Sequence, residues 1–496
     1  MSVRDDAVRV EALSVLSAFR EQFYRCLTAR ADTLFEVTDA LLCTDGPVRS
    51  PVDLVLAPEH RRGHGAMYAA LERGRIDIDR LRLALTATPM PRAADGRLVL
   101  AVDVTCWLRP EAHTSPERIL CHTYGRGKDQ AIMIPGWPYS VVVALETGRS
   151  SWTAPLDAVR LLPGADTATV TADQLRGVIG RLIAVGHWQP GDLDILVVVD
   201  AGYDVPRLAH VLGDLPVQVL GRMRSDRVLR RAAGLRTPGT NGRPPRHGGE
   251  FIFGDPATWG EPDHTISAET RLYGPANVHA WGRLHPRLTR RAAWHASAGL
   301  PIIEGTVIRL EVARLPSGAI PKPVWLWWSG TDATTADVDR LWQAFLRRFD
   351  IEHTFRLLKQ TLGWTSPKIR NPHTADRWTW LILAAYTQLR LARPLATDLR
   401  RPWEKPLPPD RLTPARVRRG FRHLRAKNPS PAAAPKPSRP GPGRPPGRPN
   451  TQPAPRYDVH VVRTNTSWAD AKKSKSTNPR PRRRDCGSNG VSGLTR

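Results

Sequence analysis

The sequence predicts an α/β protein whose mixed sheet carries a β-rich insertion, preceded by a helical domain and followed by a disordered basic tail. Two changes of pattern along the chain predict this organisation. Apolar residues recur with a helical period up to about residue 85, whereas runs typical of strands begin at residue 97. From residue 428 onward the chain is rich in Pro, Ser, Asn, Arg and Lys, a composition too polar and proline-rich to form a core.

Residues 1–96 are predicted to form the helical domain. "ALSVLSAFREQFYRCL" and "IDIDRLRLAL" have helical periodicity, and the basic turn "PEHRRGHGAMYAAL" joins them. This turn could present Arg61, Arg62 and His64 to phosphate groups. The alternative is that these are ordinary surface side chains on a solvated turn.

The mixed sheet is predicted to begin within residues 97–223. "RLVLAVDVTCW", "PYSVVVALE" and "WTAPLDAVRLL" have the pattern of three successive strands, and "TADQLRGVIGRLIAVG" that of a helix after Thr171. The continuous apolar run "DLDILVVVD" is typical of a buried central strand, and a helix, "VPRLAHVLG", and a strand, "PVQVLGRM", follow it. Three strands followed by alternating helices and strands indicate an α/β domain with a mixed sheet.

Residues 224–334 interrupt this domain and are predicted to form a β insertion, because "TVIRLEVARL" and "PVWLWWSG" are strand-like and turn residues separate them. Residues 335–395 then return to helix and are predicted to pack on the sheet begun at residue 97. They contain "FLRRFDIEHTFRLLK" and "HTADRWTWLILAAYTQLRLAR", the second of which has the pattern of a buried helix capped by Thr374.

The last two segments are basic. Residues 396–427 include the amphipathic helix "TPARVRRGFRHLRAK", with Thr413 as N-cap and Pro414 at the first helical position. Residues 428–496 form the tail predicted to be disordered, with 14 Lys and Arg against three Asp. Its run "PGPGRPPGRP" resembles an AT-hook, although proline- and arginine-rich linkers also produce such a run by chance.

Charge and cysteine content narrow the function classes. The 496 residues carry a formal net charge of +26 and a pI near 10.9, which points to a polyanionic partner, with nucleic acid ahead of an anionic membrane. The five cysteines include no CxxC pair, which argues against a disulfide framework or a cysteine-rich zinc site and fits a reducing cytoplasm. No signal-like segment or run of about 18 apolar residues is present, so we expect a soluble cytoplasmic protein without membrane partners.

The stretch Phe345–Lys359 is predicted to be one helix with an unusual basic face. Arg348 and Lys359 lie on the same side of this helix as Glu352, together with Phe345. Other positions form an apolar stripe that is predicted to pack on a core: Ile351, Phe355, Leu358 and Leu362. The alternative to a functional face is a solvated one with an ordinary Arg/Glu pair, which contributes only a few tenths of a kcal/mol.

Two aspartates lie on or after apolar strands, namely Asp103 within "VLAVDVT" and Asp200 at the end of "ILVVVDAGYD". Taken singly, each could be a turn former or a helix cap. If the helix with Glu352 packs beside these strands, the three acids converge as hard oxygen ligands that suit Mg²⁺ or Mn²⁺. Two such ions about 4 Å apart can activate the attacking oxygen and stabilise the leaving oxygen of a phosphodiester. Arg348 and Lys359 would then hold phosphates beside the metal site.

With these residues, the chain resembles insertion-sequence transposases that have a DDE catalytic triad on an RNase H-like fold. The resemblance is to the branch with a tyrosine-x2-arginine-x3-glutamate-x6-lysine signature and a β insertion in the catalytic domain. Arg348, Glu352 and Lys359 match the spacing, and Phe345 replaces the tyrosine, so its hydroxyl contact to DNA is lost. Asp200-Ala201-Gly202-Tyr203 matches the DxG-type motif, and Asp103 takes the place of the first acid.

The resemblance covers about residues 97–395 and implies catalytic and metal-binding roles for Asp103, Asp200 and Glu352, and DNA contacts for Phe345, Arg348 and Lys359. It also implies two Mg²⁺ or Mn²⁺ ions, cleavage at terminal inverted repeats, transfer of 3′-OH ends to target DNA, and a homodimer in the synaptic complex. The protein would be cytoplasmic and associated with the nucleoid when bound. A catalytically inactive DNA-binding regulator and a nuclease of the same fold are the alternatives.

The predicted insertion offers a further hypothesis. In this branch a hairpin intermediate on the transposon end is common, and an aromatic residue of the insertion can hold a flipped base. The candidates in this chain are Trp325, Trp327 and Trp328. The alternative for "VWLWW" is a strand that packs on the core.

Overall fold

The computed structural model describes residues 3–124, 131–148, 150–234, 243–288, 300–315, 317–436, 447 and 452–459. All helices and strands named below belong to one compact unit, Met1–Asp458. Most of the tail that the sequence predicts to be disordered, including nearly all of the AT-hook-like run, lies outside the described residues.

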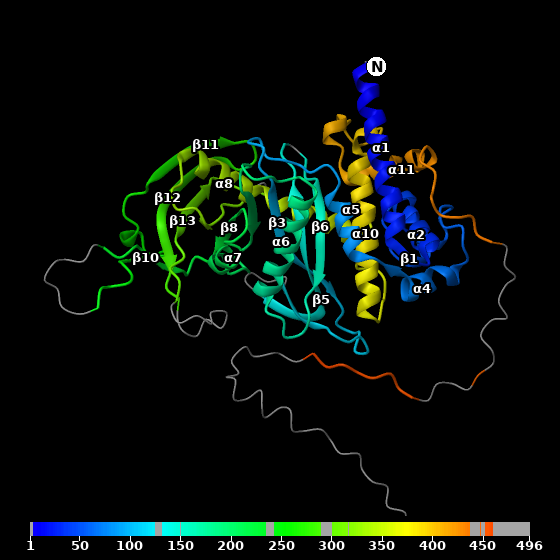
Figure 1. The fold of residues 1–496 in the computed structure, drawn as a ribbon, viewed down its shortest axis with the longest axis horizontal. Helices are drawn as coiled ribbons and strands as arrows, with labels where there is room; N and C mark the ends of the chain where they lie inside the picture. The colour runs from blue at the N-terminus through cyan, green and yellow to red at the C-terminus, as the bar shows by residue number, and fades with distance from the viewer. Residues whose placement is uncertain are drawn as a thin grey trace, which may run out of the picture. The chain divides into compact units, whose positions relative to one another are not determined.

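One mixed sheet of twelve strands dominates the structure, in the order β10-β9-β12-β13-β14-β8-β7-β3-β5-β4, with β11 paired to β12 and β6 to β5 (Figure 1). Its first strands are β3 (Val99–Leu108), β4 (Ile119–Tyr124), β5 (Ala131–Leu145), β6 (Thr153–Arg160), β7 (Ile195–Val199) and β8 (Val217–Met223). Strand β3 is antiparallel to β5 and parallel to β7, and β7 is parallel to β8. The predicted α/β class with a mixed sheet is therefore confirmed.

The segment that the sequence predicts to be an insertion contributes further strands, which extend the same sheet. They are β9 (Val228–Arg230), β10 (Glu250–Ile252), β11 (His264–Thr270), β12 (Gly274–Pro286), β13 (Gly305–Val312) and β14 (Val324–Trp328). Strand β14 pairs antiparallel with β8, in the register Trp327 to Gly221. The insertion and the strands that precede it are thus joined edge to edge by main-chain hydrogen bonds.

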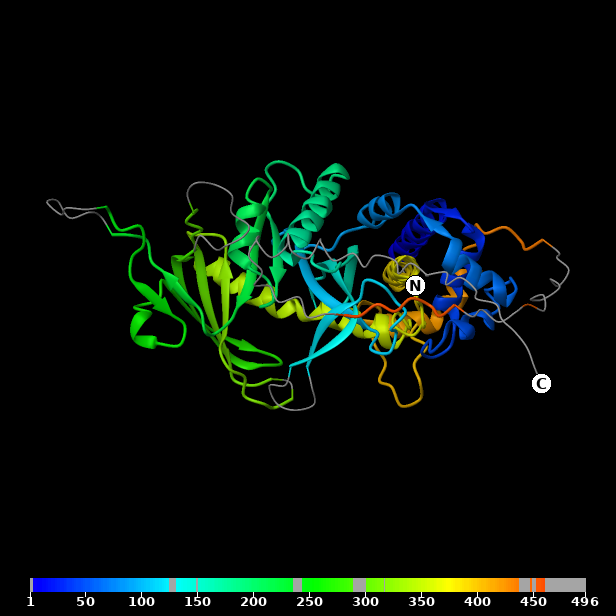
Figure 2. The same ribbon diagram turned by 90° about the horizontal axis from the view of Figure 1, so that it is seen from below.

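Helices cover both faces of the sheet. On one face lie α6 (Thr167–Ala184) and α7 (Val205–Val211), packed on alternate buried residues such as Leu100, Val102 and Val197. On the other lie α8 (Thr335–Arg347) and α9 (Phe349–Gln360), packed on Ala101 and Val198 among others (Figure 2). Strands β3 and β7 are buried on both sides, which explains their continuous apolar sequences.

The N-terminal segment is helical, and its helices share a core with helices from the end of the chain. They are α1 (Val3–Cys26), α2 (Ala31–Cys43), α3 (Pro51–Val55), α4 (His64–Arg73) and α5 (Ile78–Thr86), and two short strands, β1 (Leu27–Ala29) and β2 (Arg75–Ile76), pair beside them. Helix α10 (Pro372–Ala392) packs on α1, α2 and α5, and α11 (Pro414–Ala426) packs on α2 and α10. The predicted domain boundaries stay a prediction.

Arg61 and Arg62 are engaged within this helical layer. Arg61 pairs with the buried Glu36, and Arg62 pairs with Asp32. Both guanidinium groups also donate to main-chain carbonyls of the described part of the tail, at Ala432 and Ala433. Their proposed role as phosphate ligands would require these bonds to break, whereas His64 is exposed.

Three sequence-based details are corrected. The stretch Phe345–Lys359 is not one helix, because α8 ends and α9 begins at Arg348. Helix α10 is capped by Asn371, whose side chain accepts a hydrogen bond from the His373 amide, and not by Thr374. Strand β4 is an additional strand that the apolar pattern did not reveal.

Among the described helices, none combines the length and the apolar character needed to cross a membrane.

Candidate active site

The pairing of β3 with β7 brings the two predicted aspartates together. In this parallel register Val102 lies opposite Val199, so Asp103 and Asp200 are the next residues on neighbouring strands. Asp103 is within β3, whereas Asp200 directly follows the last residue of β7. Strand ends in an α/β sheet are where ligands bind, since the chain turns there and leaves side chains open to solvent.

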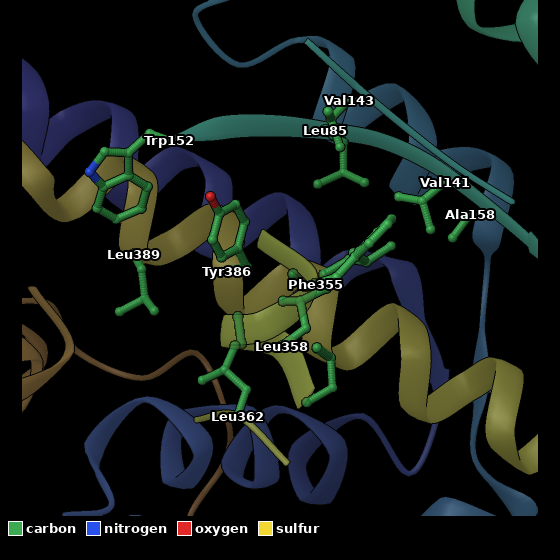
Figure 3. Packing of buried hydrophobic residues seen from close by; sticks show 14 of the residues in the cluster. Leu85, Val141, Val143, Trp152, Ala158, Phe355, Leu358, Leu362, Tyr386 and Leu389 are labelled. Atoms are coloured by element: carbon green, nitrogen blue, oxygen red, sulfur yellow. The ribbon is translucent and has the colours of Figure 1, made fainter. Parts of the chain in front are cut away.

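The junction of α8 and α9 supplies the third acid. Helix α8 begins with a capping box between Thr334 and Asp337, which fixes its start. Helix α9 is held by its buried apolar residues Ile351, Phe355 and Leu358, and Leu362 just after the helix is buried with them. Figure 3 shows Phe355 and Leu358 lying between Tyr386 of α10 and the side chains of Val141 and Ala158 from the sheet. The predicted apolar stripe is confirmed, and Glu352 in the first turn of α9 is directed away from it.

Arg348, at the junction itself, contacts all three acids. Its Nη1 donates to Asp103 Oδ2 at 3.1 Å, and its Nη2 donates to Asp200 Oδ2 and to Glu352 Oε1, each at 3.2 Å. The side chain of Arg348 is 2% exposed, whereas those of Asp103, Asp200 and Glu352 are 21%, 32% and 49% exposed. The three predicted acids therefore converge, and a buried cation lies between them.

The site has an excess of negative charge that the protein does not fully neutralise. Burial raises the pKa of Asp103 to about 6, although the charge of Arg348 and a hydrogen bond from the Val104 amide lower it. Asp200 Oδ1 is buried without a hydrogen-bond partner among the described residues, and Arg222 Nη1 lies 3.9 Å from it. An unpartnered buried carboxylate oxygen costs free energy, so a cation or donor at this position would be stabilised.

The other two predicted site residues lie in different surroundings. Lys359 is half-buried, with its Nζ 5.8 Å from the centre of the Trp364 ring, and burial lowers its pKa. Phe345 is buried in the core, and the guanidinium of Arg348 lies 5.8 Å above its ring. A contact of Phe345 with DNA would require this side chain to leave the core, and the predicted contact stays a prediction.

The acids fit a divalent cation by their chemistry, since three carboxylates provide hard oxygen ligands of the kind that Mg²⁺ and Mn²⁺ prefer. The unpartnered oxygen of Asp200 adds a free ligand atom. As they stand, no three His, Cys, Asp or Glu side chains of the described residues are placed to ligate one ion together. Arg348 explains this spacing, because it separates the carboxylates that it binds.

A basic cleft that was not predicted from the sequence lies beside Asp200. A cavity of about 670 Å³ opens between the loop after β7, the end of β8 and the insertion. The cations that line it are Arg222, Arg224, Arg309 and Lys322. A neighbouring cavity of about 760 Å³ shares Arg222 and Arg224 and adds Arg227, Arg230 and Arg287. Basic residues following β8, the strand next to β7, were the signal that could have revealed this cleft.

The three tryptophans of "VWLWW" are all buried, at 4%, 0% and 5% exposure for Trp325, Trp327 and Trp328. This favours the core-strand alternative for the segment. Of the three, Trp325 lines the smaller cavity, together with the more accessible Trp259. Arg309 lies over both of these rings, 5.0 Å from the centre of Trp259 and 5.7 Å from that of Trp325.

The family model described as DDE superfamily endonuclease matches residues 22–287, more than half of the chain. The protein belongs to this family. The match includes Asp103 and Asp200 and ends before Glu352, so the choice of the third acid depends on the geometry described above. No curated protein matches the chain.

Membership of the DDE superfamily endonucleases supports a nuclease-type enzyme acting on DNA, and members of this superfamily use divalent metal ions. The resemblance found in the sequence is thus confirmed at the level of the superfamily. The four-residue signature of one transposase branch, including Arg348 and Lys359, lies beyond the matched residues and stays a prediction.

Proposed function

We propose that the protein is a DNA transposase that binds the terminal inverted repeats of an insertion sequence, cleaves at its ends and transfers the 3′-OH ends to target DNA. The observation that carries the proposal is the convergence of Asp103, Asp200 and Glu352 on one guanidinium. Three acids from elements far apart in the sequence meet at the edge of a strand pair inside a DDE superfamily endonuclease. A solvated helix face would not require this arrangement.

In this proposal the three carboxylates hold the divalent ions, two Mg²⁺ or Mn²⁺. The bound ions supply an activated attacking oxygen and stabilisation of the leaving oxygen. Asp200 Oδ1 is available as a ligand because no described residue hydrogen-bonds to it. Arg348, which contacts the acids, and Lys359, whose pKa burial lowers although the charge of Asp103 raises it, bind phosphates next to the bond that is cut.

The basic cleft beside Asp200 supports DNA as the substrate. Arg222 near the end of β8, and Arg224 and Arg227 after it, are exposed, so their charges can contact phosphates; the ion pairs of Arg222 with Asp200 and of Arg224 with Asp226 are no shorter than 3.5 Å. The rings of Trp259 and Trp325, with Arg309 over them, offer an apolar surface on which a nucleobase can stack. A cleft lined by both cations and aromatic rings suits a nucleotide.

The strand order supports the RNase H-like fold implied by the resemblance. Three strands follow one another antiparallel as β3, β5 and β6, and then β7 and β8 add in parallel on the other side of β3. This order places the first two acids on adjacent strands.

We further propose that two copies of the chain form the synaptic complex, one for each transposon end. The protein is cytoplasmic and associates with the nucleoid when it is bound to DNA.

The test uses full-length protein, a labelled duplex carrying the terminal repeat read from the DNA that flanks the gene, a target plasmid, and Mg²⁺ or Mn²⁺. We expect a gel shift, cleavage at the repeat end and covalent joining to the plasmid. Cleavage without joined products would favour a nuclease of the same fold. Binding without cleavage under all metal conditions would favour a catalytically inactive regulator.

A further inference from the structure

Arg348 occupies the position between the three acids where the proposed function requires metal ions. We propose that Arg348 is a latch: its guanidinium holds the three carboxylates while divalent ions are absent, and leaves them for a DNA phosphate when ions bind. This inference rests on the proposed function and deepens it, because it assigns a reason for the burial of one cation at the centre of the site.

The first support is the way in which Arg348 is bonded. Its hydrogen bonds to the three acids, at 3.1–3.2 Å, are longer than the roughly 2.7–2.9 Å usual for charged pairs of this type. Its Nε is buried without a hydrogen-bond partner, as is Asp200 Oδ1. The guanidinium thus donates one hydrogen bond to each of the three acids and binds none of them in a bidentate geometry. Divalent ions can therefore replace it.

The second support is the balance of charge. A single positive charge faces three carboxylates, and Arg222, the nearest additional cation, lies 3.9 Å from Asp200 Oδ1 without a hydrogen bond to it. Divalent ions neutralise three carboxylates better than one guanidinium can, so they compete favourably for the same oxygens. The released guanidinium needs a new anion, and a DNA phosphate supplies it.

The third support is a path for the side chain. Arg348 lies between helices α8 and α9, so a rotation of its side chain does not disrupt either helix. Its guanidinium lies 5.1 Å from the centre of the Phe349 ring, and Phe349 is exposed. The guanidinium can therefore move across this ring toward solvent while it keeps a favourable cation–π contact.

The first experiment measures Mn²⁺ binding to the full-length protein by calorimetry, without DNA. If Arg348 competes with ions, Arg348→Gln tightens Mn²⁺ binding by about tenfold or more, and Arg348→Lys lies between Gln and the wild type. If Arg348 merely aligns the acids, its removal spreads them and weakens binding. The two roles thus predict opposite signs, and weaker binding to Arg348→Gln overturns the latch.

Arg222→Gln is the matched control, because it removes one positive charge near Asp200 without removing a hydrogen bond to any of the three acids. Its Mn²⁺ affinity should change by less than about threefold, since exposed charges are screened by solvent. A gain as large as that of Arg348→Gln would mean that net charge alone sets the affinity, and would overturn the latch. Circular dichroism establishes that each variant is folded.

The second experiment uses the wild type, so it does not depend on a folded variant. Phenylglyoxal modifies accessible arginines, and mass spectrometry identifies the modified sites. Arg348 should be protected without metal and become reactive when Mn²⁺ is added, whereas Arg20, equally buried in the helical layer, should stay protected in both states. Continued protection of Arg348 at saturating Mn²⁺ overturns the latch.

The failure of the latch and the failure of the proposed function have different signatures. A wild type that binds Mn²⁺ and cleaves DNA, with Arg348 still protected or with Arg348→Gln binding Mn²⁺ more weakly, contradicts the latch alone. Absence of both Mn²⁺ binding and cleavage, in the wild type and in Arg348→Gln, contradicts the proposed function and the latch together.

Discussion

Among the described residues, Arg20 and Arg348 are the most deeply buried arginines, and they differ in what surrounds them. Arg20, in the helical layer, is 1% exposed; it donates both Nη atoms to Asp39, at 2.7 and 3.1 Å, and one of them to Gln388 at 2.6 Å. Its partner Asp39 is 0% exposed and also accepts from Arg425. This is an enclosed ion pair in which two guanidinium nitrogens bond to both oxygens of one carboxylate, although Arg20 Nε, like Arg348 Nε, has no hydrogen-bond partner among the described residues.

Arg348 is buried to the same degree, yet its partners are not. Each of its three acids keeps between a fifth and a half of its side-chain surface exposed, and each receives only one hydrogen bond from it. A buried cation is therefore not by itself a sign of a structural pair. The exposure of the partners and the geometry of the bonds distinguish a permanent ion pair from a cation that another can replace.

The largest expected effect is the loss of DNA cleavage when one of the three acids is replaced, with little change in stability. Asp200→Asn should lower DNA cleavage by about 10⁴-fold or more, because an ion ligand is lost, while the free energy of unfolding changes little. Glu352→Gln and Asp103→Asn should behave alike, and their effects should not add, since the three acids serve one site. Denaturing gels of cleavage and gel shifts of binding measure this, with the exposed Asp173→Asn on α6 as control. Cleavage by Glu352→Gln at the wild-type rate would refute the triad.

The second prediction applies the same kind of substitution to the enclosed pair. Asp39→Asn should lower the free energy of unfolding by about 3 kcal/mol or more, because two arginines lose their buried counter-ion. Chemical denaturation of this variant beside Asp200→Asn measures the difference directly. Equal stability losses in the two variants would show that the enclosed and the exposed acids are energetically alike.

The third prediction concerns the basic cleft. Arg224→Gln combined with Arg227→Gln should weaken DNA binding and reduce the slope of log K against log salt by about 1.8, if each arginine contacts one phosphate. The protein should remain folded, because both side chains are exposed. Binding measured at several salt concentrations tests this, and an unchanged slope would place the DNA elsewhere.

The smallest effect concerns pH and the helical layer. His60 is buried with both ring nitrogens unpartnered among the described residues, and burial lowers its pKa, although the charge of Glu36 raises it. The folded protein then binds fewer protons than the unfolded chain, so this contribution to stability is present above pH 6.5 and is lost as the pH falls below it. Between pH 7 and pH 5, the melting temperature of His60→Gln should fall less than that of the wild type, by on the order of 1 °C. Equal decreases in melting temperature for the variant and the wild type between pH 7 and pH 5 would contradict this prediction.

The sequence predicted the sheet where its strands are buried on both faces and therefore continuously apolar, as in β3 and β7. It did not reveal strands such as β11, whose sequence "HTISAET" alternates between partly and fully exposed residues and carries little apolar signal. The extension of one sheet through the insertion was also not predicted from the sequence. Pairing between β8 and β14 joins residues about a hundred positions apart, and local pattern does not encode it.

At the candidate site, the acids were predictable because carboxylates within or after apolar strands are unusual. The placement of Arg348 was not, because helical periodicity assumes an unbroken helix from Phe345 onward. The interruption at Arg348 turns its side chain into the space between the acids. An exposed cation contributes little to folding, whereas Arg348 is buried and bonds to three carboxylates.

The continuous sheet has a consequence for how a cut site would be chosen. Hydrogen bonds run without interruption from β13 through β14 and β8 to β7, so the cleft next to Trp259 and the acids at Asp200 are built on one rigid frame. A nucleotide gripped in that cleft would lie at a fixed distance from the acids. The position of the cut would then be set by a fixed distance from the bound nucleotide, independently of the base sequence between them.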